Sequence, residues 1–193
     1  MTVRILCMAA SLRRASLNKK LARACAVSAE LLGAHARVVD LRDYPMPLYD
    51  GDIEAADGVP ATAALLAGQV IEADALIIAS PEYNGGPPAV LKNSLDWMTR
   101  LGKADGEPAG RTVLALKPTL LVSASPGALG GLRGSIVARL MLSQMGLQLL
   151  PMTVAVGQAG QAFSPDGQLT DGSLQRSMES AIQQLILLAG PRG

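Results

Sequence analysis

Short apolar runs that alternate with helical patterns limit the folds open to this chain more than any other feature. Four runs are apolar almost throughout, at residues 3–9, 37–41, 75–79 and 119–122, and a weaker fifth run covers residues 147–156. Runs of this length and continuity are typical of strands buried on both faces of a parallel sheet. The sequence therefore predicts a parallel sheet with five strands.

Helical patterns lie between these runs. Apolar residues recur every three or four positions over residues 17–32, 136–141 and 174–185, and residues 89–98 are also helix-like. Alternating strands and helices indicate an α/β fold, and right-handed crossovers place the helices on both faces of the sheet. With 193 residues and no repeat or linker, we expect a single domain over residues 1–193.

Three stretches are predicted to be long loops. Residues 42–59, 100–118 and 157–172 are rich in Gly, Pro and Asp and too polar for the core. We expect these loops to border the functional site or an oligomer contact.

Composition and charge narrow the possible functions. Seventeen basic residues face sixteen acidic ones, so a net charge of +1 gives no electrostatic reason to expect nucleic acid or an anionic membrane as partner. The first apolar run is too short for a secretory signal and is followed by Arg13 and Arg14, which favours a cytoplasmic location. No run has the length of about 18 residues that a membrane helix needs.

The titratable side chains exclude several kinds of catalytic site. His35 is the single histidine, which argues against Ser–His and Cys–His pairs and against sites with several histidines. We interpret His35 as a surface residue just before a strand. Cys7 and Cys25 fall in a strand-like and a helix-like segment, and we interpret both as core residues.

The loop after the first run is a candidate anion site. Hydroxyls at Ser11 and Ser16, a guanidinium at Arg13 or Arg14 and the amide of Asn18 come together where a helix begins near residue 18. Unpaired N–H groups and the helix dipole favour an anion there. The alternative is that Ser16 or Asn18 only caps the helix while the arginines are solvated. The loop alone does not decide between a cap and a phosphate site, and neither common glycine-rich phosphate motif is present.

The junction at residues 80–88 is the second candidate site. It follows the apolar run 75–79 directly and precedes the helix-like residues 89–98. In an open parallel sheet, ligands bind at the carboxyl ends of the strands. The junction therefore places a carboxylate, a phenol and an amide, those of Glu82, Tyr83 and Asn84, where a ligand is expected.

Taken together, these motifs resemble the NADPH-dependent FMN reductase family, which includes chromate, quinone and azo reductases. Three patterns carry the resemblance, namely Ser11-x-Arg13-x-x-Ser16-x-Asn18, Pro81-Glu82-Tyr83-Asn84 and Leu91-Lys92-Asn93-x-Leu95-Asp96-Trp97. Residues 47–50 and 123–131 fit as well, so the likeness spans almost the whole chain. Each motif is weak alone, but the ordered set is specific.

The resemblance implies a flavodoxin-like three-layer fold with strand order 2-1-3-4-5 and noncovalent FMN between the first and third strands. It also implies NADPH or NADH as co-substrate and a homodimer or homotetramer, with exposed apolar residues on the third predicted helix available for burial. The expected cofactor-binding residues are Ser11, Arg13, Ser16, Leu17 and Asn18 at the phosphate, Pro81, Glu82, Tyr83, Asn84 and Gly85 at the ring, and Ser123, Ser125, Gly127 and Gly130 as a third wall.

Two departures from the family pattern affect these expectations. Ala10 stands where the family usually has glycine, and its Cβ would make a positive φ costly and shift the phosphate site. Gly86-Pro87 replaces a commoner polar–apolar pair, which changes the expected shape of the ring's rim.

For three residues and one glycine-rich segment, the sequence allows two interpretations. Tyr83 either covers the ring or packs beside Pro87, and Glu82 either faces the flavin or is solvated or intersubunit. Trp97 is expected in the core or an interface rather than on a substrate. The glycines of residues 127–131 form a turn or allow close approach to a ligand.

The chemistry implied needs no strong base, because hydride transfer belongs to the flavin. Backbone N–H groups near Asn84, Gly85 and residues 125–131 are the expected donors to the reduced ring. We therefore predict an FMN-dependent NAD(P)H oxidoreductase that passes electrons to a quinone, azo compound, flavin or oxidised metal ion. The alternatives are a flavodoxin-like electron carrier or flavin-binding module, and a flavin-free protein that binds another phosphate ester.

Overall fold

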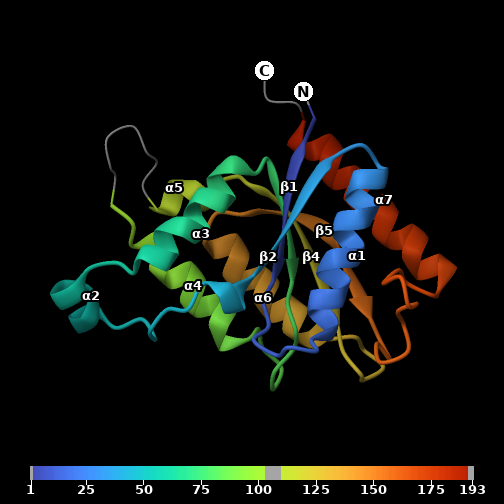
Figure 1. The fold of residues 1–193 in the computed structure, drawn as a ribbon, viewed down its shortest axis with the longest axis horizontal. Helices are drawn as coiled ribbons and strands as arrows, with labels where there is room; N and C mark the ends of the chain where they lie inside the picture. The colour runs from blue at the N-terminus through green and yellow to red at the C-terminus, as the bar shows by residue number, and fades with distance from the viewer. Residues whose placement is uncertain (1, 103–109, 191–193) are drawn as a thin grey trace.

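The computed structural model describes residues 2–102 and 110–190, and it has a five-stranded sheet in the order β2-β1-β3-β4-β5 (Figure 1). All strand pairs are parallel. The strands are β1 Arg4–Ala9, β2 His35–Asp40, β3 Ala75–Ala79, β4 Pro118–Ala124 and β5 Gln148–Val156. The predicted strand order is confirmed.

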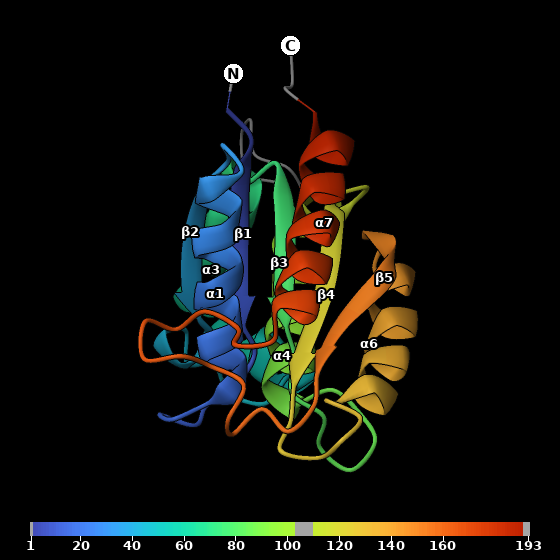
Figure 2. The same cartoon turned by 90° about the vertical axis from the view of Figure 1, so that its right-hand side faces the viewer.

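Helices cover both faces of the sheet (Figure 2). Helices α1 Leu17–Leu31 and α7 Gly172–Ala189 lie on one face, and α3 Ala61–Glu72, α4 Ala89–Thr99, α5 Gly110–Leu114 and α6 Leu132–Gln144 lie on the other. Successive strand residues point to opposite faces, so Ile5 and Cys7 pack toward α1 and α7 while Leu6 and Met8 pack toward α3 and α4. The fold is the predicted flavodoxin-like three-layer sandwich.

The register brings the carboxyl ends of the central strands to one level. Ala9 at the end of β1 is paired with Ala79 at the end of β3, and the Ala10 N–H extends this pairing to the Ala79 carbonyl at 3.0 Å. Among the described residues other than glycine, only Asn84, Leu116 and Gln158 have a positive φ. Ala10 therefore continues the strand without strain, and the expected cost of its Cβ does not arise.

Some predicted boundaries were wrong. The stretch 42–59 contains α2 Gly51–Asp57, whose first turn is capped by the Asp50 carboxylate accepting from the Asp52 N–H at 2.8 Å. The second strand begins two residues earlier than predicted, and Leu41 starts a 3-10 turn, Leu41–Asp43. Helix α5 and the first residue of β4 lie in the predicted loop 100–118, of which residues 103–109 are outside the described part.

Helix α3 was given no predicted range, because its apolar residues occupy both of its sides. Leu66 is fully buried whereas the neighbouring Leu65 is 63% exposed. A helix with apolar residues on several sides has only a weak period. The structure, by contrast, places this helix clearly against the sheet and α4.

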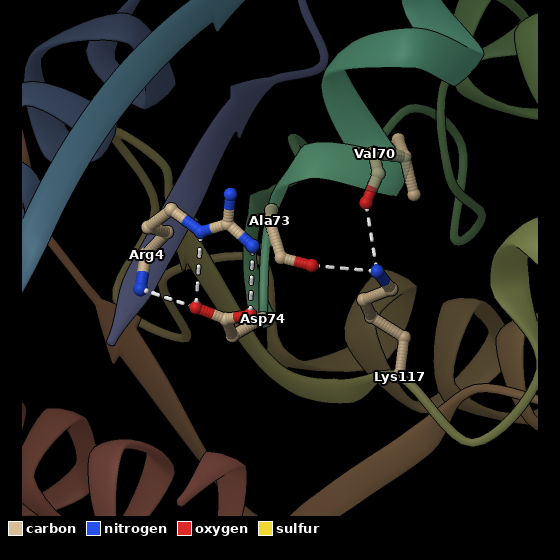
Figure 3. Close-up of polar contacts among 5 residues, drawn as sticks. All are labelled: Arg4, Val70, Ala73, Asp74 and Lys117. Atoms are coloured by element: carbon tan, nitrogen blue, oxygen red, sulfur yellow. Dashed lines mark hydrogen bonds and ion pairs between the residues drawn. The ribbon is translucent and has the colours of Figure 1, made fainter. Parts of the chain in front are cut away.

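Polar contacts join the elements at the end of the sheet where β1 begins (Figure 3). The Asp74 carboxylate accepts from the Arg4 backbone N–H at 2.8 Å and from its guanidinium at 3.2 and 3.3 Å. Lys117 is buried, and its Nζ donates to the carbonyls of Val70 at 2.8 Å and Ala73 at 2.6 Å. These contacts hold α3 and the starts of β1, β3 and β4 together, far from the loops that follow the strands.

The readings of the cysteines and the histidine are confirmed. Cys7 and Cys25 are free thiols with no exposed surface, and burial raises the pKa of Cys25 to about 12 and that of Cys7 well above its usual value. His35 is exposed and is the first residue of β2. Within residues 2–102 and 110–190, no helix is long and apolar enough to cross a membrane.

Candidate functional site

The loop after β1 lines a small cavity beside the start of α1. The cavity has a volume of about 80 Å³, and its lining residues are Ser11, Arg13, Ser16, Leu17, Asn18, Pro81, Glu82, Tyr83, Ala124, Ser125 and Pro126. All five residues predicted in the first loop are thus brought together, and they meet residues from the loops after β3 and β4. The residues predicted to contact the phosphate therefore line one cavity, and their binding of a phosphate stays a prediction.

Helix capping and ligand contact are compatible at Ser16. Its Oγ accepts from the Lys19 N–H at 3.4 Å, and the Ser11 Oγ likewise accepts from the Arg13 N–H at 3.4 Å. A hydroxyl that accepts a hydrogen bond still has its own O–H to donate. Both hydroxyls therefore remain available to an anion in the cavity, and the exposed Arg13 adds a charged donor.

Asn18 has a structural contact that the sequence did not indicate. Its side chain is buried, its Nδ2 donates to the Ala124 carbonyl at 2.9 Å, and its Oδ1 accepts from the Ala124 N–H at 3.0 Å. The amide therefore fixes the end of β4 to the start of α1. Because the two residues are 106 positions apart, no local signal could have revealed the pair.

A partly buried ion pair lies behind the first loop and supports it. Lys19 is 5% exposed, and its Nζ lies 2.6 Å from Oδ2 of Asp40 at the end of β2. The other oxygen of Asp40 accepts from the Arg42 N–H at 3.0 Å, and the Arg42 guanidinium donates to the Leu12 carbonyl at 3.0 Å. The sequence singled out none of these residues, although they hold the loop that lines the small cavity.

A tight turn follows β3. The N–H of Tyr83 donates to the Gly86 carbonyl at 2.9 Å, and the N–H of Gly86 donates back to the Tyr83 carbonyl at 3.1 Å. Asn84 and Gly85 between them have φ values of 52° and 80°, as in the type I′ turns that Asn-Gly pairs favour. The turn therefore presents Asn84 and Gly85 as exposed backbone, and Tyr83 is 47% exposed beside them.

A larger cavity lies between this turn and the loop after β4. Its volume is about 640 Å³, which lies in the usual range of roughly 300–1,000 Å³ for small-molecule sites. The lining residues are Glu82, Asn84, Gly85, Ser125, Gly127, Ala128, Leu129, Gly130, Gly131 and Arg133. Glu82 and Ser125 line both cavities, so the two adjoin.

The glycines of the β4 loop have different roles. Gly130 has a φ of 62°, and a Cβ there would lie 2.6 Å from the carbonyl carbon of Val156, so this glycine lets the loop approach β5. A Cβ at Gly127 would meet only the Ser125 Oγ, at 3.7 Å, so Gly127 keeps the cavity open. Gly130 is therefore required because the loop after β4 lies close to the end of β5.

Ser123 lies below the cavities rather than at their surface. It is fully buried in β4, and its Oγ lies 3.3 Å from where a Cβ of Gly131 would be. Within the described part of the chain, the Ser123 hydroxyl has no hydrogen-bond partner. Of the predicted site residues, Ser123 is the one that neither cavity includes.

Glu82 joins the two loops that border the larger cavity. Its Oε1 accepts from Arg133 Nε at 3.2 Å, and its Oε2 accepts from the Gly134 N–H at 3.1 Å in the first turn of α6. A Cβ at Gly134 would lie 2.8 Å from Cβ and Cγ of Glu82. The carboxylate is therefore occupied by α6, an arrangement that the sequence did not suggest.

The third motif of the resemblance, residues 91–97 on α4, binds the loop that contains Pro47 and Tyr49. The Pro47 carbonyl accepts from Trp97 Nε1 and from Asn93 Nδ2, both at 2.8 Å, and the Tyr49 N–H donates to Asn93 Oδ1 at 2.8 Å. The Tyr49 and Trp97 rings pack edge to face at 5.1 Å. Trp97 is fully buried, which confirms its predicted place in the core.

Residues 3–161 match the NADPH-dependent FMN reductase family. The chain belongs to this family. It is 35% identical to a quinone reductase of Pseudomonas putida over 162 residues, which are 83% of this chain and 81% of that protein. It is 30% identical over 187 residues to a probable NADPH:quinone oxidoreductase 1 of Oryza sativa subsp. japonica, covering 95% of this chain and 90% of that protein.

Among solved structures, the chain is similar to FerB, a flavoenzyme NAD(P)H:(acceptor) oxidoreductase from Paracoccus denitrificans. The TM-score is 0.77 at 26% identity, and the match covers 97% of both chains. This member of the FMN reductase family is thus an NAD(P)H-dependent oxidoreductase with FMN as cofactor, as predicted. These matches favour the enzyme over the two alternatives, an electron carrier and a flavin-free protein.

The shape and donors of the site fit FMN. The small cavity has hydroxyls, a guanidinium and the amino end of α1, which suit a phosphate. The larger cavity is walled mostly by loop backbone and small residues, and a Cβ at Gly85 would meet nothing within 4 Å. The space in front of Gly85 is therefore open to a ligand. No metal-binding cluster of acidic, His or Cys side chains occurs among the described residues.

Proposed function

We propose that this FMN reductase uses NAD(P)H to reduce quinones, with the FMN phosphate in the small cavity and the flavin ring in the larger one. The observation that carries the proposal is that the two cavities adjoin at the carboxyl ends of β1, β3 and β4. Quinones are the favoured acceptors because two relatives that match over most of the chain, a quinone reductase and a probable NADPH:quinone oxidoreductase, are named for quinone reduction. Azo compounds, flavins and oxidised metal ions remain in the acceptor screen.

The chain's own residues bind and orient the cofactor. The phosphate would accept hydrogen bonds from Ser11, Ser16 and Arg13, with the N–H groups at the start of α1 behind them. The other cavity residues proposed to contact FMN are Leu17, Asn18, Pro81, Glu82, Tyr83, Asn84, Gly85, Ser125, Gly127 and Gly130. Tyr83 lines the small cavity, precedes the turn residues Asn84 and Gly85 of the larger cavity and is 47% exposed, so it is proposed to cover the ring.

Bound FMN would supply the hydride and electron chemistry between the nicotinamide and the acceptor. The chain contributes backbone around Asn84, Gly85 and residues 127–131, whose fixed dipoles stabilise negative charge on a ligand without reorganising. Glu82 is committed to Arg133 and α6, so we assign it no role as a base. The residues of this site therefore act by holding, not by proton transfer.

Binding of FMN and riboflavin tests the phosphate assignment. The two flavins differ only in the phosphate, so we expect FMN to bind more tightly when titrated by the quenching of flavin fluorescence. Arg13→Gln should weaken FMN binding by about 10- to 100-fold, the worth of one charged hydrogen bond, and leave riboflavin unchanged. Arg37→Gln on the exposed side of β2 is the matched control. Equal affinities of the native protein for the two flavins would refute the assignment.

Initial rates test the use of one cavity by donor and acceptor. If NAD(P)H and the quinone occupy the larger cavity in turn, double-reciprocal lines at several quinone concentrations should be parallel. Intersecting lines would mean that donor and acceptor bind together, which contradicts the proposal. A screen of quinones, azo dyes, free flavins and chromate then identifies the preferred acceptor.

We propose that the protein forms a homodimer or homotetramer through α6 and acts in the cytoplasm. Ile136, Val137 and Leu140 on α6 are 64%, 47% and 65% exposed, which is unusual for a cluster of large apolar side chains. Leu140→Lys should lower the mass measured by light scattering, and an unchanged mass would exclude this face. Cell fractionation tests the cytoplasmic location.

A further inference from the structure

Arg133 lies at the rim of the larger cavity, and only part of its guanidinium is hydrogen-bonded. It is the second residue of α6, its side chain is 73% exposed, and it lines the cavity together with Glu82 as the charged pair among the lining residues. Its Nε donates to Glu82 at 3.2 Å. In the described part of the chain, its two terminal amino groups have no protein partner within hydrogen-bond distance.

The carboxylate that contacts Arg133 is itself held in place. The Glu82 side chain is 11% exposed, and the Gly134 N–H holds its second oxygen at 3.1 Å. An arginine anchored through Nε keeps four N–H donors in a planar fork that matches a phosphate with two parallel hydrogen bonds. Because the anchor restricts rotation before a ligand arrives, less conformational entropy is lost on binding.

Arg133 is also separated from the phosphate site proposed for FMN. The small cavity includes Arg13 from the loop after β1, whereas Arg133 lies at the larger cavity, on α6 after β4. A ligand that enters the larger cavity with an anionic group of its own would therefore meet Arg133. Simple quinones carry no such group, but both nicotinamide dinucleotides carry a pyrophosphate, and NADPH carries an additional 2′-phosphate.

We propose that Arg133 binds a phosphate of the nicotinamide dinucleotide and is a specificity-determining residue for the electron donor. Glu82 holds Arg133 in place for this contact. The inference rests on the proposed function, because it requires the nicotinamide to enter the larger cavity. It goes further by naming the residue that recognises the donor's charged part.

Equilibrium binding of NADP⁺ tests the proposal without turnover. In isothermal titration of the FMN-loaded protein, Arg133→Gln should weaken NADP⁺ binding by about 10- to 100-fold, the loss expected for charge-assisted hydrogen bonds. The dependence of the affinity on salt should become shallower in the same variant. Arg37→Gln should bind like the native protein. Unchanged NADP⁺ affinity in Arg133→Gln would overturn the proposal.

A donor without phosphates separates recognition from general damage. N-benzyl-1,4-dihydronicotinamide is neutral and carries the same reactive ring, so Arg133→Gln should use it with native kcat/KM while losing efficiency with NADPH. Equal losses with NADPH and NADH identify the pyrophosphate as the bound group, and a loss with NADPH alone identifies the 2′-phosphate. Equal losses with the neutral donor, or a change confined to the KM of the quinone, would overturn the proposal.

Failure of the proposed function is recognised separately. The visible spectrum of each purified protein reports its flavin content before any donor is added. A native protein that takes up no FMN refutes the flavin site itself. Full flavin content with unaltered NADP⁺ binding in the variant refutes only the role of Arg133.

Discussion

Gly134→Ala tests whether the first turn of α6 packs in close contact with Glu82 beside the larger cavity. The added Cβ would lie 2.8 Å from both Cβ and Cγ of Glu82 and 3.0 Å from its Cα. Because backbone is among these atoms, rotation of the Glu82 side chain cannot relieve the overlap. Overpacking of this kind costs about 1–3 kcal/mol, while alanine in place of glycine in a helix returns at most about 1 kcal/mol. We therefore expect a net loss of roughly 1–2 kcal/mol of unfolding free energy.

The chain provides a matched control for this substitution. Gly68 lies inside α3, and a Cβ there would meet nothing within 4 Å, so Gly68→Ala should stabilise the protein by about 0.5–1 kcal/mol. Urea denaturation followed by circular dichroism measures both variants, and their free energies should move in opposite directions. For a chain of this size, the melting temperature should fall by roughly 2–8 °C in Gly134→Ala. If Gly134→Ala is as stable as Gly68→Ala, the close contact with Glu82 is not real.

Three further predictions concern other parts of the molecule. Lys117→Met should lower the unfolding free energy by about 1–3 kcal/mol in urea, because two buried carbonyls at the end of α3 lose their donor; native stability would contradict this. Cys7 and Cys25 should resist a thiol reagent at pH 8 until the protein is unfolded, because burial raises their pKa values, and rapid labelling of native protein would refute this burial. Hydrogen bonds, chiefly from the Leu174 amide, lower the pKa of Asp171, so its contribution to stability is complete above about pH 4 and disappears as the pH falls through the lowered value. In Asp171→Asn, the unfolding free energy should therefore depend less on pH below about pH 4. The same acid dependence as in the native protein would exclude this role for Asp171.

Much of the fold was predictable because buried parallel strands leave a local trace. Residues 75–79 are apolar at every position, and the structure buries all of them in β3. Elements with a mixed surface left less trace, as α3 shows with buried Leu66 beside exposed Leu65. The short helix α2 was missed because it has no buried residue, so only the Asp50 cap marked it.

The candidate site was predictable to the extent that its residues are consecutive. The turn after β3 follows from its Asn84-Gly85 pair, and the structure gives both residues the positive φ that such a pair favours. Asn18 is different, because its partner Ala124 belongs to another strand and either an anion or a cap was an equally reasonable partner. Ser123 was expected at the ligand because it belongs to the motif, but it is buried within β4 and packs against Gly131.

The strand order explains how residues from distant parts of the sequence meet at the site. Once β3 and β4 are neighbours in the sheet, the loops that follow them must face each other, and a residue at the start of α6 can reach the loop after β3. Glu82, Arg133 and Gly134 satisfy this condition, and glycine at 134 is what lets the carboxylate come close enough to the helix end. The contact removes Glu82 from acid–base chemistry and at the same time leaves a guanidinium with unused donors at the cavity. An unpaired Glu82 carboxylate would repel the anionic nicotinamide dinucleotide. Paired with Arg133, it instead holds the guanidinium that is proposed to bind this dinucleotide.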